Sequence, residues 1–130
     1  MALSDNKEVV AKEGRLLSVK MKGSTQIYKG AMISINASGY AGPAAANETF
    51  IGMAYEEMNN ADGDGDVEVR VIRDELHLVK GSGLAQSDML ADAFASDDEN
   101  IIVTGETTEP RIGKVVEIVS ATEAYVDITK

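Results

Sequence analysis

The residues best suited to chemistry gather in one short loop, Asn59-Asn60-Ala61-Asp62-Gly63-Asp64-Gly65-Asp66. Side-chain oxygens at alternating positions, with glycine for a tight turn, are the pattern of a calcium-binding EF-hand loop. If Asn60 takes the first position of that motif, the twelfth is Val71, where a bidentate Glu is needed. No helix is expected on either side. We therefore interpret the loop as a Gly- and Asp-rich turn that leads into a strand.

His77 is the single histidine of the chain, and there is no cysteine. A zinc site with two histidines is therefore impossible, and any serine triad would have to use His77. No G-x-S-x-G elbow accompanies it. Because His77 stands between Leu76 and Leu78, we predict that it lies on a strand and faces outward.

Two further patterns have the composition of a site without its spacing. Gly81-Ser82-Gly83 begins like a phosphate-binding loop, but Gln86 stands where the third glycine is needed. The acidic runs Glu56-Glu57 and Asp97-Asp98-Glu99 contain the carboxylates that glycoside hydrolysis uses, yet adjacent acids in polar turns are usually solvated. We predict no catalytic residue, no metal site and no cofactor.

The composition predicts one small domain with an aliphatic core. The chain has 130 residues, of which 44% are hydrophobic and 5% aromatic, and it has no tryptophan. A chain of this length usually has a single core. Because no disulfide can staple it and the core is modest, oligomerisation is an expected source of stability.

The charge is unevenly distributed along the chain. Residues 1–29 contain six basic and three acidic residues, whereas residues 30–130 contain six basic and nineteen acidic ones, for a total of −10. Overall acidity argues against nucleic acid as a partner. We predict that residues 1–27 form a separate extended arm. Neither a signal peptide nor a membrane-spanning run is found, so we expect synthesis in the cytoplasm and no membrane partner.

From Gly30 onward, short β-rich runs alternate with turn residues, which predicts an all-β domain over residues 28–130. The clearest strand is Asp66 to Ile72, where Val67, Val69 and Val71 share one face. We expect it to form a hairpin with Leu76 to Val79. Two more hairpins are expected, Ala91 to Ala95 with Ile101 to Thr104, and Ile112 to Val119 with Ala124 to Ile128. A short helical segment is expected within Leu84 to Leu90.

The order of these segments resembles the small trimeric decoration, or cement, proteins of tailed-phage heads. The resemblance extends from about Tyr28 to Thr129. The matching pieces are Gly30 to Ile35, Ser38-Gly39-Tyr40 with Pro43-Ala44-Ala45, Phe50 to Ala54, Gly65 to Arg70, Leu84 to Asp98, Ile112 to Glu117 and Tyr125 to Ile128. Asp74-Glu75-Leu76-His77-Leu78 departs from the family pattern, which has a glycine turn and an aromatic residue there.

This resemblance implies a small β-barrel or tulip-like sandwich that forms a homotrimer on the outer surface of the virion and binds the major capsid protein. Its work would be mechanical, because a clamp across several capsid subunits stabilises the assembled shell against internal DNA pressure. We expect the basic residues of the arm to bind the capsid: Lys7, Lys12, Arg15, Lys20 and Lys22. Phe50, Tyr55 and Leu90 are the candidate residues of the trimer interface.

One alternative belongs to a different class. The Asn59 to Asp66 loop would also suit a small calcium- or carbohydrate-binding β-module of a phage fibre or adhesin. An enzyme is a third possibility, for which the sequence offers neither a nucleophile nor a phosphate loop.

Overall fold

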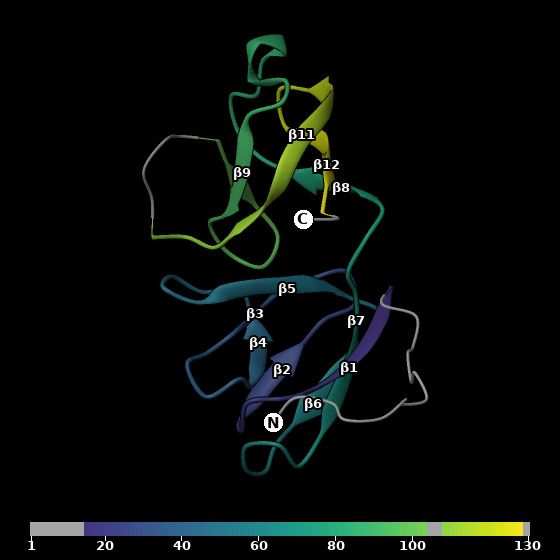
Figure 1. Ribbon diagram of the computed structural model, residues 1–130, viewed down its shortest axis with the longest axis vertical. Helices are drawn as coiled ribbons and strands as arrows, with labels where there is room; N and C mark the ends of the chain where they lie inside the picture. Colours follow the sequence, from purple (N-terminus) through teal and green to yellow (C-terminus); the bar gives the residue numbers. More distant parts are fainter. Residues whose placement is uncertain (1–14, 104–107, 129–130) are drawn as a thin grey trace, which may run out of the picture.

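The computed structural model describes residues 15–103 and 108–128 and confirms the all-β prediction (Figure 1). The described chain forms two lobes that lie one above the other along the long axis. The first lobe contains the strands β1 (Leu16–Lys20), β2 (Thr25–Ile27), β3 (Met32–Ile35), β4 (Ala41–Pro43), β5 (Thr49–Ala54), β6 (Met58–Asn60) and β7 (Glu68–Ile72). The second lobe contains β8 (Leu76–Lys80), the 3-10 turn η1 (Gln86–Asp88), β9 (Asp92–Ala95), β10 (Ile101–Ile102), β11 (Arg111–Ser120) and β12 (Glu123–Asp127).

The sheet of the first lobe has the order β1-β7-β5-β3-β4, with every neighbouring pair antiparallel. Val69 and Val71 of β7 are fully buried, while Glu68 and Arg70 on the opposite face are exposed, as period-two alternation requires. An isolated bridge between Met21 and Ala41 brings the two edges of this sheet together at one point. A two-stranded ladder, β2 with β6, completes the lobe.

The sheet of the second lobe has the order β10-β9-β11-β12-β8 and is also antiparallel. It curls in the same way, because an isolated bridge joins Lys80 at the end of β8 to Asn100 just before β10. Among the described residues neither sheet closes into a barrel, so the architecture is that of a small β-sandwich.

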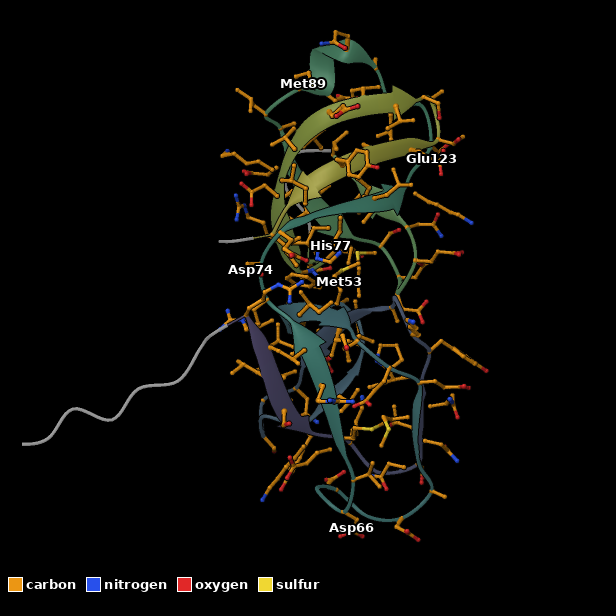
Figure 2. All side chains as sticks on the ribbon, turned by 90° about the vertical axis from the view of Figure 1, so that its right-hand side faces the viewer. Met53, Asp66, Asp74, His77, Met89 and Glu123 are labelled. Carbon is orange, nitrogen blue, oxygen red and sulfur yellow. The ribbon has the colours of Figure 1, made fainter. Side chains whose placement is uncertain are left out.

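Each lobe has its own apolar core. The core of the first lobe is aliphatic and includes Met21, Ile27, Ile33, Val69 and Val71. The core of the second lobe is built on Ile112, Val115 and Val126, but it also takes in Met32, Ala44 and Met53 from the first lobe. The two lobes therefore pack as one body, with Met53 and His77 visible at their junction (Figure 2).

The predicted N-terminal arm is wrong for residues 16–27. These residues form β1 and β2, and both Met21 and Ile27 have no exposed surface. Their apolar side chains complete the first core, which a loose arm would leave unfilled. Residues 1–14 of the predicted arm lie outside the described part of the chain.

The predicted hairpin between Asp66–Ile72 and Leu76–Val79 is also wrong. β7 pairs with β1 and β5, whereas β8 pairs with β12 in the other sheet. Glu75 lies between them with a φ of 84°, a left-handed conformation, and the chain passes there from one lobe to the other.

The other two hairpins are confirmed as β9 with β10 and β11 with β12. The predicted helical segment is confirmed as the single turn η1. No helix within residues 15–103 and 108–128 is long and apolar enough to cross a membrane.

Candidate interaction surfaces

The basic residues predicted to bind a capsid do not form one free arm. Lys7 and Lys12 lie outside the described residues. Arg15 is held at the junction of the lobes, with its Nη2 2.6 Å from Glu75 Oε2 and its Nε 3.5 Å from Asp74 Oδ1. The Arg15 hydrogen bond keeps the pKa of the Glu75 carboxyl below its usual value. Arg15 therefore fixes the start of β1 against the turn that leads into β8.

Lys20 and Lys22 lie at the end of β1 and just after it. Lys20 is exposed and stands opposite Glu68 in the register of β1 and β7. The Nζ of Lys22 lies 3.9 Å from Glu48 Oε2. Both ammonium groups are accessible to a partner with negative charge, but Lys20 lies in β1 and Lys22 shortly after it, so neither belongs to a free tail.

Tyr55 belongs to a small cluster on the first lobe. Its ring lies under the guanidinium of Arg70, 5.0 Å from the ring centroid to Cζ, and Arg70 makes hydrogen bonds of 3.1 and 2.8 Å to the two carboxylate oxygens of Glu56. The Arg70 side chain lowers the pKa of Glu56. Tyr55 remains 45% exposed, so this cluster presents an ordered aromatic and cationic surface.

The structure does not bring the three predicted interface residues together. Phe50 is partly buried against the core of the second lobe. Leu90 is 64% exposed with a φ of 65°, and it follows Met89, which Figure 2 shows at the end of the molecule opposite Asp66. Tyr55 and Leu90 therefore mark two separate surfaces, one on each lobe.

The Asn59 to Asp66 loop is held by hydrogen bonds within itself and to residues 21–23, which follow β1. Asn60 is fully buried, and its Nδ2 donates hydrogen bonds to the carbonyl oxygens of Met21, Lys22 and Gly63. Asp64 Oδ1 accepts from the backbone N–H of Gly23 at 2.7 Å, and Asp66 Oδ2 accepts from that of Gly63. These side-chain oxygens stabilise the turn, as the sequence interpretation proposed. Within the described residues no three His, Cys, Asp or Glu side chains lie close enough to share a metal ion.

His77 faces the inside of the second sheet and not the solvent, contrary to the prediction. It shares a face of β8 with Val79, which is buried, and it is itself half-buried. Its Nε2 lies 3.0 Å from the carbonyl oxygen of Asp74. The imidazole thus helps to hold the turn between the lobes.

Sequence reasoning missed the apolar outer face of β8. Leu76 is 55% exposed and Leu78 47% exposed, whereas the sequence predicts only that both lie in a hairpin with Asp66 to Ile72. One face of this strand has Leu76, Leu78 and Lys80 and the other has His77 and Val79. Both faces are therefore partly apolar in the sequence, and neither can be assigned to the core.

A cavity of about 170 Å³ lies at the junction of the lobes, beside β8. Its lining includes Met32 and Met53 of the first lobe, Val79 of the second, and the turn residues Asp98 and Glu99. The backbone N–H of Met32 donates to the carbonyl oxygen of Asp98 at 2.8 Å, which holds the turn against the first lobe. Because methionine and valine side chains form these walls, the cavity offers space and apolar contact more than chemistry.

Comparisons of the chain with protein-family models, with curated proteins and with solved structures gave no match.

Proposed function

We propose that this chain is a non-enzymatic structural protein that decorates the outer surface of a phage head as a homotrimer bound to the major capsid protein. The observation that carries the proposal is the run of segments from about Tyr28 to Thr129 that resembles the head decoration proteins. The all-β fold agrees with the fold that the resemblance implies.

Exposed apolar side chains support a role in assembly. Large apolar residues on the surface of a single copy include Tyr28, Tyr55, Leu76, Leu78, Leu90 and Val119, each at least 45% exposed. Apolar groups on the surface are most informative where they lie side by side, because contiguous patches mark interfaces. Leu76 and Leu78 satisfy that condition on one face of β8.

The mechanism follows from linkage. A protein that binds the assembled shell and not the separate capsid subunits shifts the equilibrium toward the shell by its binding free energy. Three linked copies gain avidity, since the second and third contacts form at a high effective concentration. The protein would be made in the host cytoplasm and then reside on the outside of the virion.

Two measurements test the proposal. Light scattering is expected to give a mass three times the 13.8 kDa of one chain. Undecorated heads assembled from the major capsid protein of the same genome are expected to co-sediment with the protein and to rupture at a higher temperature. A monomer that stays in the supernatant would contradict both parts of the proposal.

Variants separate the two predicted surfaces. Tyr55→Ser and Leu90→Ser are expected to lower the trimer fraction if these residues lie at the interface. Lys20→Glu and Lys22→Glu are expected to weaken co-sedimentation while the mass stays trimeric. Lys29→Glu is the matched control, because Lys29 is an exposed base outside the predicted capsid-binding set.

A further inference from the structure

Three apolar side chains form a strip on the outer face of the second sheet. Leu76 and Leu78 point to the face opposite the buried Val79. Tyr125 of β12 stands directly opposite Leu78 in the antiparallel register and is half-buried, so its ring shares the outer face. We call Leu76, Leu78 and Tyr125 the apolar strip.

Charged residues bound the apolar strip on both sides along the strands. Lys80 and Glu123 form the next register pair toward one end, and Asp127 stands opposite Leu76 at the other. An apolar centre with a polar rim is typical of a surface that another segment covers.

The N-terminal segment of the chain begins beside this strip. The first described residue, Arg15, makes its ion pairs with Asp74 and Glu75, and Glu75 immediately precedes Leu76. Figure 2 shows Asp74 at the point where β1 and β8 both begin. Fourteen residues precede Arg15, and they include Met1, Leu3, Val9 and Val10.

The N-terminal segment is long enough to reach across the apolar strip. Fourteen residues in an extended conformation span at most about 46 Å, at roughly 3.3 Å per residue. The strip extends over two adjacent strands, about 5 Å apart, and three positions along β8, roughly 7 Å. A tether of this length holds its own apolar side chains near the strip at a high effective concentration.

We propose that the N-terminal segment, residues 1–14, docks over the apolar strip of its own chain through Val9 and Val10. In the isolated protein, Val9 and Val10 then cover the apolar strip. This inference does not depend on the proposed capsid function. A covered strip removes Leu76 and Leu78 from the surface available for assembly and leaves the exposed side chains of Tyr28, Tyr55, Leu90 and Val119.

A spin label on the segment tests this placement in the full chain. Because the chain has no cysteine, Asn6→Cys provides a single site for a nitroxide and leaves Val9 and Val10 in place. We expect the amide resonances of Leu76, Leu78 and Tyr125 to be broadened severalfold when label and isotope are on the same chain. A mixture of isotope-labelled chains without the nitroxide and nitroxide-labelled chains without the isotope, allowed to exchange subunits, is expected to show no such broadening.

Two outcomes would overturn the inference. Absence of broadening at the strip in the first sample would show that the segment lies elsewhere. Broadening of equal or greater strength in the mixed sample would assign the strip to the segment of a neighbouring copy. Neither result bears on co-sedimentation with heads, so the two proposals fail separately.

Matched variants check that the strip itself is the docking site. In the Asn6→Cys chain, Leu76→Ser with Leu78→Ser is expected to abolish the broadening at Tyr125. Val119→Ser is the control, since Val119 is exposed to the same 47% as Leu78 but lies outside the strip. Unchanged broadening in the double variant would also contradict the inference.

Discussion

Met32 and Asp98 connect the two lobes through a backbone hydrogen bond of 2.8 Å, from the N–H of Met32 in β3 to the carbonyl oxygen of Asp98 in the turn between β9 and β10. The side chain of Met32 is 1% exposed and packs in the core of the second lobe, although its strand belongs to the first sheet. The lobes therefore share a core as well as a hydrogen bond.

Met32→Ala is expected to destabilise the whole molecule by about 2–5 kcal/mol, because it opens a cavity in the shared core. Calorimetry is expected to show one unfolding transition at a lower temperature, as both lobes lose packing together. Two separate transitions in the unaltered protein would contradict the shared core.

Asn60→Ala is expected to cost about 1–3 kcal/mol, because the carbonyl oxygens of Met21, Lys22 and Gly63 lose their common donor in a buried site. Urea unfolding measures this change. Asn59→Ala is the control, since Asn59 is exposed, and it is expected to stay within about 0.5 kcal/mol of the parent. Equal effects of the two substitutions would show that the buried amide has no special role.

Gly113→Ala is expected to disrupt the pairing of β11 with β12. A Cβ at this position would overlap the backbone carbonyl of Asp127, which cannot move without breaking the ladder. We expect loss of the native fold, measured as lost near-ultraviolet circular dichroism. Gly63→Ala is the comparison, because a Cβ there meets only the end of the Asp66 side chain at 3.4 Å, and native-like folding is expected.

Acid is expected to weaken the second sheet through Asp92. Arg111 and then Lys114 donate hydrogen bonds to its carboxylate and lower its pKa below the unfolded value. The contribution of Asp92 to stability is therefore complete above about pH 4 and is lost as the pH falls through the lowered pKa. Asp92→Asn is expected to reduce the loss of thermal stability between pH 7 and pH 2.5. An identical loss in both proteins would remove Asp92 from the acid response.

The sequence predicted those parts of the fold in which pairing is local. The hairpins β9–β10 and β11–β12 each join neighbouring segments through a short polar turn, so alternation and turn residues were sufficient to recognise them. The same reasoning recognised the Asn59 to Asp66 loop as a turn, because Asn and Asp side chains bond to nearby backbone.

Only the tertiary structure decided where β7 and β8 go and which of their faces are covered. Both strands have the pattern of a hairpin, yet each finds its partner far along the chain, β7 with β1 and β8 with β12. Alternation specifies two faces but not which partner covers them, since that depends on contacts between distant segments. For this reason residues 16–27, expected in an arm, contribute Met21 and Ile27 to the first core, and Leu76 and Leu78, expected in a hairpin with β7, lie exposed on β8.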